Sequence, residues 1–369
     1  MTLRVPFMSL VPGPDQAAVR EAIDRVITRG WFVLGPELTA FETEFAQACG
    51  GKHAVGVGTG TDAIALTLRA LGIGPGDEVI TAPMSAAYTA LAIMMAGATP
   101  IFADLDPNRL TMDPGATAAA VTPRTAAILP VHLYGQPADM TGLEAVAARH
   151  DLALVEDACQ AHFATAGGRP VGTIGVAGTF SFYPTKNLGA LGDAGAVVTG
   201  DSALADKLKR LRNGGQIDRY HHLEFGVNSR LDEMQAAILR ARLPFMAGWT
   251  ARRRELATRY RRTLDGAPVF VPPERDAGHV YHLFPVLTPE RDALQAHLQQ
   301  SGVGTLVHYP MSIPRQEALR HLPSAPCPVA ERVANEVCSL PLNPNLSDAD
   351  ADFVAAAIHA WRATTTVRS

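Results

Sequence analysis

Short runs of β-branched and other apolar residues alternate with segments rich in alanine and leucine between residues 54 and 200 of this chain. This alternation is typical of strands that are joined by helices in a largely parallel sheet. The predicted strands are 54–57, 78–82, 99–104, 126–131, 152–157, 178–183 and 195–200. The predicted helices are 61–71, 85–96, 140–150 and 202–212. We therefore expect an α/β fold with helices on both faces of the sheet, and functional side chains at the carboxyl ends of its strands.

The character of the sequence changes after about residue 240. The stretch TARRRELATRYRRTL is basic and helical, and a shorter pattern of strand and helix follows it. Pro244 is expected to break a helix near the change, and the run 252–254 is expected to form a solvated helix face. We therefore predict an N-terminal segment and large domain at 1–243, followed by a smaller α+β domain at 244–369.

Composition excludes several classes of function. The 32 basic and 36 acidic residues give a net charge of -4, which is unlike the basic surface of a nucleic-acid-binding protein. The four cysteines are scattered without a C-x-x-C pair, so we predict neither a disulfide framework nor a metal site. Prolines and glycine interrupt the apolar window 79–103, which favours strand, helix and strand over a membrane span. The N-terminus lacks the apolar core of a signal peptide, and we expect a cytoplasmic protein.

A glycine-rich turn lies between the first predicted strand and helix, in GVGTGTDAIALTLRALG (56–72). Backbone N–H groups at such a helix start, together with threonine hydroxyls, can bind a phosphate. The spacing is neither G-x-G-x-x-G nor that of a P-loop, so an ordinary strand-to-helix turn with a threonine cap is the alternative.

An acidic pair, Glu156 and Asp157, ends the apolar run LALVED. Alternate side chains of a strand face opposite sides, so one of these carboxylates is expected to face a pocket at the edge of the sheet. There it would hold a cation or a protonated ring nitrogen. The alternative for Asp157 is a helix cap.

The segment FSFYPTKNLGALGDAGAVV contains a single basic residue, Lys186, just after a predicted strand. Lys186 is either a solvated side chain or an amine held in a pocket for chemistry. The predicted sheet places it at the same edge as Asp157 and the 58–61 turn. An amine, an acid and a phosphate-binding turn together indicate pyridoxal phosphate.

The chain resembles the sugar aminotransferases of the DegT/DnrJ/EryC1/StrS family, which share the fold-type I architecture of aspartate aminotransferase. The resemblance covers nearly the whole length, and its ordered blocks are together highly specific. The matching blocks are GWFVLGPELTAFETEFA, GTGTDAIALTLRALGIGPGDEVI, ILPVHLYGQPADM, VEDACQAH, FSFYPTKNLGALGDAGAVVT, LRNGGQ and GVNSRLDEMQAAILRARL. The resemblance implies a fold-type I pyridoxal-phosphate-dependent transferase.

By position, the resemblance implies that Lys186 is the Schiff-base lysine and that Asp157 pairs with the pyridine nitrogen of the cofactor. It also implies that Gln160 contacts the ring oxygen. Gly60 and Thr61 would bind the phosphate through the backbone and a hydroxyl.

The resemblance further implies that Ser181 adds its hydroxyl to the phosphate site and that Asn228 reaches the phosphate of a neighbouring subunit, so that the active site requires a homodimer. His308 and Tyr309 are implied as substrate contacts. The aromatic residue that stacks on the cofactor in many relatives is replaced here by Ala86. Tyr88 is the alternative stacking residue, but two residues along a helix is the wrong side of a turn, and we predict that Tyr88 packs in the core.

Together these assignments imply an aminotransferase that moves an amino group from L-glutamate to C3 or C4 of a nucleotide-linked keto-deoxysugar, with dTDP as the expected nucleotide. The expected order is ping-pong through pyridoxamine phosphate. One alternative is a nucleotide-sugar dehydratase on the same fold, but the relatives that remove a hydroxyl carry histidine at the position of Lys186. The other is a non-enzymatic regulatory protein, which the complete set of cofactor residues disfavours.

Overall fold

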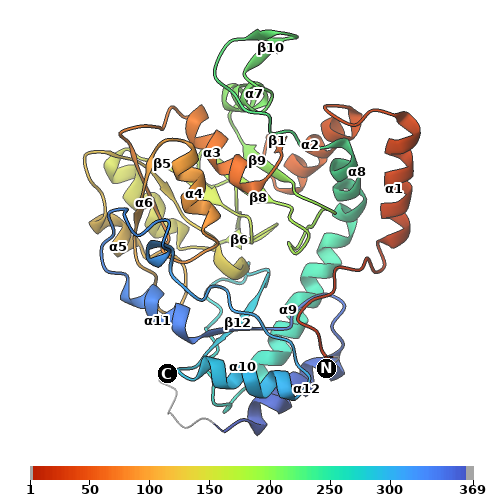
Figure 1. Cartoon of the computed structure of the whole chain (residues 1–369), viewed down its shortest axis with the longest axis vertical. Helices are drawn as coiled ribbons and strands as arrows, with labels where there is room; N and C mark the ends of the chain where they lie inside the picture. Colours follow the sequence, from red (N-terminus) through yellow and green to blue (C-terminus); the bar gives the residue numbers. More distant parts are fainter. Residues whose placement is uncertain (1–2, 363–369) are drawn as a thin grey trace.

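A seven-stranded sheet forms the centre of the computed structural model, which describes residues 3–362 (Figure 1). Its strands are β1 (His53–Val57), β2 (Glu78–Thr81), β3 (Thr99–Phe102), β4 (Thr125–Leu129), β5 (Ala153–Asp157), β8 (Ala177–Ser181) and β9 (Gly195–Thr199). Their order is β1-β9-β8-β5-β4-β2-β3. Strand β9 is antiparallel to both neighbours and the other pairs are parallel. The predicted mostly parallel sheet is confirmed.

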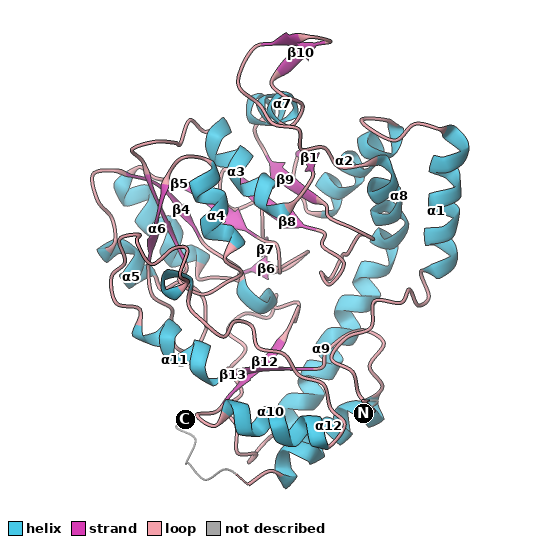
Figure 2. Cartoon of the chain, viewed as in Figure 1, coloured by secondary structure: helices cyan, strands magenta, loops and turns pink. Residues whose placement is uncertain are grey.

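Helices cover both faces of this sheet, as Figure 2 shows. They are α2 (Pro36–Ala48), α3 (Gly60–Ala70), α4 (Tyr88–Met95), α5 (Pro114–Ala119), α6 (Met140–His150) and α7 (Ser202–Leu211). Consecutive strand residues enter different cores: Ile128 packs with the α2 and α6 side, whereas Ala127 and Leu129 pack with α3 and α4. This alternation follows from the two-residue period of a strand, and it explains why both faces of the strands are apolar.

The C-terminal part contains a second, smaller core. The helices and strands of this part are α9 (Met246–Thr263), β12 (Phe284–Leu287), α10 (Arg291–Gln300), α11 (Pro328–Glu336), β13 (Val337–Leu340) and α12 (Asp348–Ala360), of which α11 packs on the large core. Tyr260, Phe284 and Leu294 are fully buried in this core. The N-terminal segment also contacts this part, because Val5 forms a bridge with Val303. The α+β character agrees with the prediction, and the division at residue 243 stays a prediction.

Helix α8 (Glu233–Arg242) leads into α9 through the short 3-10 turn η2 (Leu243–Phe245), which contains Pro244 (Figure 1). The prediction that residues 252–254 form a solvated helix face is wrong for one of these residues. Arg253 is only 4% exposed, because α9 turns it toward the carbonyl groups of Tyr281, His282 and Leu342.

The remaining elements are α1 (Gln16–Arg29), the 3-10 turns η1 (Leu133–Gly135) and η3 (Ile313–Arg315), and the hairpin strands β6 (Thr165–Ala166), β7 (Arg169–Pro170), β10 (Gln216–Asp218) and β11 (His221–His222). Leu133, Tyr134, Ala166 and Ile313 from this group are buried in the large core. The β10 hairpin projects beyond α7 at the top of Figure 1. Among the helices of residues 3–362, none has the length and hydropathy that a membrane crossing requires.

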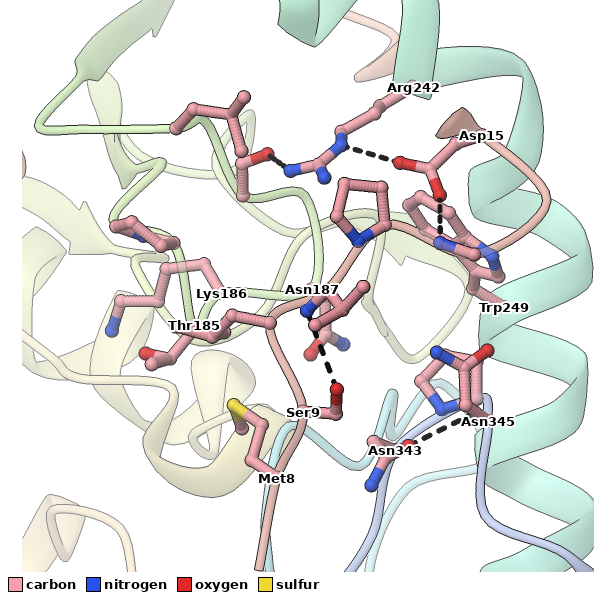
Figure 3. A pocket seen from close by; sticks show the side chains of 18 of the residues that line it. Met8, Ser9, Asp15, Thr185, Lys186, Asn187, Arg242, Trp249, Asn343 and Asn345 are labelled. Carbon is pink, nitrogen blue, oxygen red and sulfur yellow. Dashed lines mark hydrogen bonds and ion pairs between the residues drawn. The ribbon is translucent and has the colours of Figure 1, made fainter. Parts of the chain in front are cut away.

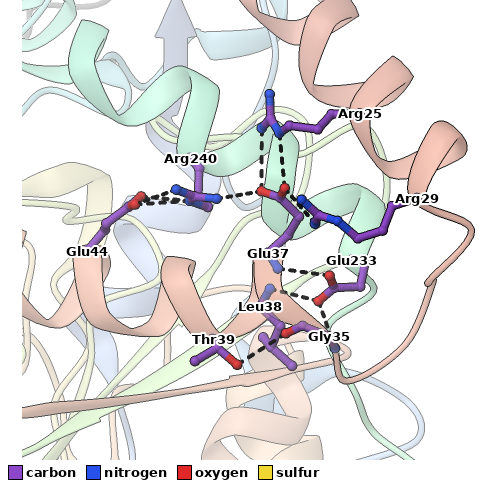
Figure 4. Close-up of polar contacts among 9 residues, drawn as sticks. All are labelled: Arg25, Arg29, Gly35, Glu37, Leu38, Thr39, Glu44, Glu233 and Arg240. Carbon is purple, nitrogen blue, oxygen red and sulfur yellow. Dashed lines mark hydrogen bonds and ion pairs between the residues drawn. The ribbon is translucent and has the colours of Figure 1, made fainter.

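A carboxylate from α8 completes the start of α2 (Figure 4). Glu233 is fully buried and accepts hydrogen bonds from the backbone N–H groups of Gly35, Glu37 and Leu38 at 2.8–3.0 Å. These groups have no partner within the helix, so the carboxylate replaces the missing acceptors. A Cβ at Gly35 would lie 2.7 Å from Glu233 Oε2, which explains why glycine precedes the helix.

Glu37 connects α1, α2 and α8 through three arginines (Figure 4). Its carboxylate lies 3.0 Å from Arg25, 3.1 Å from Arg29 and 2.6 Å from Arg240. Burial raises the pKa of this carboxyl, but hydrogen bonds and charges from Arg25 and Arg240 outweigh burial and lower the pKa to about 2. The ionised form of Glu37 therefore stabilises the packing of the three helices.

Glu37→Gln is expected to reduce the free energy of unfolding at pH 7 by about 3 kcal/mol. This is the free energy that corresponds to lowering the pKa of the carboxyl from 4.5 to about 2. A carboxyl with a lowered folded-state pKa stabilises the fold above its unfolded pKa near 4.5 and loses this effect as pH falls toward 2. The stabilities of wild type and variant should therefore converge between about pH 4.5 and pH 2. Urea unfolding across this range measures the difference.

Glu44→Gln is the matched control, because Glu44 shares Arg240 with Glu37 but is partly exposed. An exposed ion pair is worth about 0–1 kcal/mol. If Glu37→Gln were no more destabilising than Glu44→Gln at pH 7, the stabilising role of the buried carboxylate would be refuted.

Candidate active site

A cavity of about 570 Å³ lies at the carboxyl ends of β5 and β8, where the sequence places the chemistry. It brings together residues that are far apart in the chain. The predicted site residues that line it are Gly60, Thr61, Asp157, Gln160, Ser181, Lys186, His308 and Tyr309. Asn228 does not line this cavity. It is exposed and forms a bridge with Asn213.

The turn before α3 packs closely against β8. Thr59 caps the helix by accepting a hydrogen bond from the Asp62 N–H at 2.9 Å. A Cβ at Gly60 would lie 2.7 Å from the Cβ of Ser181, so a larger residue would fill the space beside the helix start. The turn thus keeps backbone N–H groups and hydroxyls at the cavity, an arrangement that suits a phosphate.

Asp157 is held by two donors at the end of β5. Its Oδ2 accepts a hydrogen bond from Thr89 Oγ1 at 2.8 Å, and its Oδ1 accepts one from the Cys159 N–H at 3.1 Å. Ser85 Oγ lies 3.1 Å from Thr89 Oγ1 and extends this chain of polar groups. Asp157 is 4% exposed and lines the cavity, so its carboxylate has a fixed orientation there. It does not cap a helix, which excludes the alternative reading of this residue.

Glu156 points to the opposite side of β5, as the strand period predicts. Its carboxylate accepts hydrogen bonds from the N–H groups of Gly172, Ile174 and Gly175 at 2.7–2.9 Å. It also lies 3.2 Å from His132 Nε2. Glu156 therefore organises the loop before β8, whereas Asp157 faces the cavity.

Lys186 lies in a tight turn after β8, where its N–H donates to the Tyr183 carbonyl at 2.8 Å. Burial lowers the pKa of its amine, while the neighbouring Cys159 and Asp157 act in the opposite direction. The side chain borders the cavity instead of the outer surface, which disfavours a solvated lysine. An amine with a lowered pKa is more readily available as a base and as a nucleophile.

Gln160 connects the η1 turn with Tyr309 of the C-terminal part of the chain. Its Oε1 accepts a hydrogen bond from the Tyr134 N–H at 2.8 Å, and its Nε2 donates to Tyr309 Oη at 3.1 Å. Burial raises the pKa of Tyr309 to about 12, and burial together with the charge of Lys186 lowers the pKa of His308 to about 4. At neutral pH the cavity therefore contains a protonated phenol and an uncharged imidazole.

His282 is a cavity residue that the sequence analysis did not single out. Its Nδ1 lies 3.2 Å from Asn187 Oδ1, and the Asn187 amide donates to the Val280 carbonyl at 3.2 Å. The amide orientation thus makes Nδ1 the protonated nitrogen of the ring. Burial lowers the pKa of His282 well below its ordinary value. No pattern in the sequence indicates that the segment HVYHLF (279–284) lies close to Lys186.

The turn before the helix that carries Thr89 contains the departure from the family pattern. Ala86 and Tyr88 both line the cavity. Tyr88 is 64% exposed, so the prediction that it packs in the core is wrong: it is the first residue of α4 and borders the cavity and solvent. Thr89, in contrast, is buried and turned toward Asp157. Within residues 3–362, no group of three histidine, cysteine or acidic side chains could hold a metal ion.

Comparison with known proteins agrees with this geometry. A profile of the DegT/DnrJ/EryC1/StrS aminotransferase family matches residues 15–359. The dTDP-3-amino-3,4,6-trideoxy-alpha-D-glucose transaminase of Streptomyces venezuelae is 47% identical over 98% of this chain and 97% of its own length. A UDP-N-acetyl-3-dehydro-alpha-D-glucosamine 3-aminotransferase of Acidithiobacillus ferrooxidans is 44% identical over 94% of both chains.

Solved structures extend the comparison to the fold and the cofactor. DesV of S. venezuelae superimposes with a TM-score of 0.94 over 98% of this chain and 99% of its own, at 47% identity. NtdA of Bacillus subtilis, solved with bound pyridoxamine phosphate, superimposes with a TM-score of 0.90 over 98% of this chain and 85% of its own, at 31% identity. The chain therefore belongs to the DegT/DnrJ/EryC1/StrS aminotransferase family and is a pyridoxal-phosphate-dependent aminotransferase of fold type I.

Proposed function

We propose that this enzyme transfers an amino group from L-glutamate to C3 or C4 of a nucleotide-linked keto-deoxysugar, with dTDP as the nucleotide. The observation that carries the proposal is the single cavity that joins Lys186, Asp157 and the Gly60 turn. The relatives include dTDP-sugar and UDP-sugar aminotransferases, which supports a nucleotide-linked sugar as the acceptor. The two half-reactions would follow one another in ping-pong order.

The residues around Asp157 suit the ring of the cofactor. Pyridoxal phosphate, when bound, accepts the electron pair that is released at the substrate carbon. We assign Asp157 to the ring nitrogen, where an ionised carboxylate would keep that nitrogen protonated. Thr89 and the Cys159 N–H hold the two carboxylate oxygens in place. We assign Gln160, three residues after Asp157, to the ring oxygen of the cofactor.

The start of α3 is the proposed phosphate site. Gly60 leaves room beside Ser181, and Thr61 and Ser181 line the cavity with hydroxyls. The helix N-terminus contributes N–H groups and partial positive charge, which favour a dianion. We propose that Asn228 of a second copy completes this site, because Asn228 is exposed and outside the cavity of its own chain.

Lys186 is the proposed anchor of the cofactor and the proposed acid–base group. Its amine has a lowered pKa, so the neutral form that accepts a proton is accessible. We propose that Lys186 Nζ takes the proton from the donor carbon in the first half-reaction. In the second half-reaction the same nitrogen would deliver a proton to the carbon of the sugar.

His308 and Tyr309 are the proposed contacts to the sugar. The imidazole is uncharged and the phenol is protonated at neutral pH, so both can exchange hydrogen bonds with hydroxyl groups. The homodimer is supported by exposed apolar side chains near the start of α2, namely Trp31, Phe32 and Val33. A cytoplasmic location and the two-domain division at residue 243 are parts of the same proposal.

The absorbance spectrum of the purified enzyme tests the proposed function. We expect a visible band of bound pyridoxal phosphate that disappears with L-glutamate and returns when a dTDP-linked keto-sugar is added. A panel with UDP- and GDP-linked keto-sugars distinguishes the nucleotides. A protein that cannot be loaded with the cofactor, or a band that no amino acid changes, would refute the proposal.

A further inference from the structure

His282 lines the active-site cavity together with Lys186, and no contact to substrate or cofactor is assigned to its imidazole. The side chain is 5% exposed, and its Nδ1 donates to Asn187 Oδ1 at 3.2 Å. Because Nδ1 carries the proton, Nε2 is an acceptor, and it has no hydrogen-bond partner among residues 3–362. Buried polar groups are normally paired, so a free acceptor at a cavity indicates that a donor occupies this position during the reaction.

Asn187 determines both the tautomer and the position of this imidazole. It follows Lys186 directly in the chain, and its Nδ2 donates to the Val280 carbonyl at 3.2 Å, which leaves the amide oxygen for His282. Asn187 also lines a second cavity, of about 310 Å³, and the amine of Lys186 is directed away from that cavity (Figure 3). The turn therefore places the amine in the active-site cavity and, one residue later, the amide that holds His282.

The backbone around His282 is held from two sides. The Val280 N–H donates to the Gly135 carbonyl at 3.1 Å, and Arg253 Nη1 donates to the carbonyl groups of Tyr281 and His282 at 3.2 and 3.4 Å. Gly135 has a φ of +89°, and a Cβ there would lie 2.9 Å from the backbone nitrogen of His282. The imidazole is therefore attached to a fixed segment of backbone and holds its place beside the cavity.

Lys186 has an environment that complements this acceptor. Its Nζ forms no hydrogen bond and no ion pair with any residue from 3 to 362. Burial, followed by the charge of Lys186, lowers the pKa of His282 well below its ordinary value, so the imidazole is uncharged at neutral pH and does not repel an ammonium group. The other groups whose charges act on His282 are Arg253, His308 and His162, and those that act on Lys186 are Cys159 and Asp157.

We propose that His282 Nε2 accepts a hydrogen bond from Lys186 Nζ and thereby aims this nitrogen at the reacting carbon of the substrate. The inference rests on the proposed function, because it takes Lys186 as the acid–base group. A lysine amine ends a flexible four-carbon chain, so an acceptor that holds one N–H bond gives the lone pair a defined direction. When the substrate C–H bond breaks, the proton joins this lone pair and the electron pair passes to the bound cofactor. His282 keeps its own proton on Nδ1, so it is a positioning residue for Lys186.

Two substitutions separate the two nitrogens of the imidazole. His282→Asn keeps an amide N–H near the position of Nδ1, which can donate to Asn187, but it has no acceptor at the position of Nε2. His282→Gln places an amide oxygen near the position of Nε2. We expect the maximal rates of both half-reactions to fall about 10- to 100-fold in His282→Asn, the range for a hydrogen bond to a charged group, and less than about 10-fold in His282→Gln.

The half-saturating concentrations of L-glutamate and of the keto-sugar should stay as in wild type, because Lys186 acts in both half-reactions and His282 contacts neither substrate. Single-turnover measurements on the holoenzyme determine both quantities. A raised half-saturating concentration for one substrate, with unchanged maximal rates, would show that His282 is a substrate contact and would overturn the proposal.

The pKa of Lys186 provides a readout that does not depend on turnover. An acceptor stabilises the ammonium form, so the loss of Nε2 should lower the pKa of Lys186 further. Damage that admits water would instead raise this pKa toward its ordinary value, because burial is what lowers it. Acetylation of Lys186 by acetic anhydride across a pH series, quantified by mass spectrometry on the pyridoxamine phosphate form of the full-length enzyme, measures the midpoint. A midpoint in His282→Asn that equals or exceeds that of wild type would contradict the proposed hydrogen bond.

His279→Asn is the matched control, because His279 is a buried histidine of the same segment that does not line the active-site cavity. Its Nδ1 accepts a hydrogen bond from the Tyr281 N–H at 2.9 Å, and an asparagine oxygen can replace this acceptor. The acetylation midpoint of Lys186 should stay at its wild-type value in this variant. A shift as large as that in His282→Asn would show that the effect does not depend on Nε2.

Asn187→Ser is the second variant if His282→Asn does not fold. It removes the acceptor of Nδ1, so the imidazole proton is free to move to Nε2, and the pKa of Lys186 should again fall. A midpoint at or above that of wild type would overturn the proposal in this variant as well.

The same measurements separate this inference from the proposed function. A wild-type enzyme whose bound cofactor reacts with no amino donor would defeat the proposed function itself. A wild-type enzyme that reacts normally, with a His282→Asn variant of equal maximal rates and equal acetylation midpoint, would defeat only the positioning role of His282.

Discussion

Lys186→Ala is expected to reduce turnover by about 10⁴-fold or more, the upper range for the loss of a general acid–base group that is also the nucleophile. The variant lacks the amine that anchors the cofactor and the nitrogen that moves the proton at the substrate carbon. Steady-state turnover measures the loss. Borohydride reduction provides a second readout, because it should fix the cofactor covalently to the wild-type chain and not to the variant.

The fold should tolerate this change, because the turn around Lys186 depends on backbone hydrogen bonds that alanine retains. Circular dichroism and the thermal midpoint should match those of wild type. Lys209→Ala, which removes an exposed lysine of α7, is the control and should keep full activity. Turnover in Lys186→Ala that equals the control would disprove the assignment of the catalytic amine.

Asp157→Asn is expected to lower turnover by about 10²- to 10³-fold, as for the loss of one preorganised electrostatic contact. The amide has the shape of the carboxylate but no charge to retain a proton on the ring nitrogen. The variant should therefore also shift the pH dependence of the absorbance of the bound cofactor. Spectral titration of wild type and variant detects this shift independently of turnover.

Asp206→Asn on the exposed side of α7 is the control for the general effect of removing a carboxylate. It should leave both turnover and the spectral titration unchanged. Thr89→Val should produce a smaller shift of the titration than Asp157→Asn, since it removes one of the two donors to the carboxylate. An Asp157→Asn enzyme with wild-type spectra at every pH would show that the carboxylate does not serve the ring nitrogen.

The strands of the large domain could be predicted from the sequence because local pattern determines them. Each predicted run coincides with a strand to within one or two residues at the ends, and 140–150 coincides with α6. The main difference is the start of α4. The helix was expected from residue 85, but it begins at Tyr88, because Ser85 and Ala86 form a turn in which Ser85 Oγ donates to the Ala86 carbonyl.

Much of the site could be predicted as well, since strand ends in a parallel sheet meet at one edge. The supporting residues could not. Thr89 donates to a carboxylate 68 residues away, and His282 meets Asn187 across 95 residues. Arg253 was assigned to a solvated face, because its neighbours Arg252 and Arg254 are basic and the inward direction depends on how α9 packs. Such contacts follow from tertiary packing, and no local pattern in one sequence encodes them.

The carboxylate that completes α2 has a consequence for how the chain is made. Gly35 and its acceptor Glu233 are separated by 198 residues, and synthesis at about 5–20 residues per second puts about 10–40 s between them. During that interval the start of α2 on the ribosome has no Glu233 to accept its N–H groups, and α8, against which α1 and α2 pack, does not yet exist. The first 50 residues therefore reach their final structure only after the loop that carries Lys186 has been synthesised. In a nascent chain that stops before α8, this N-terminal region should remain accessible to chaperones and proteases.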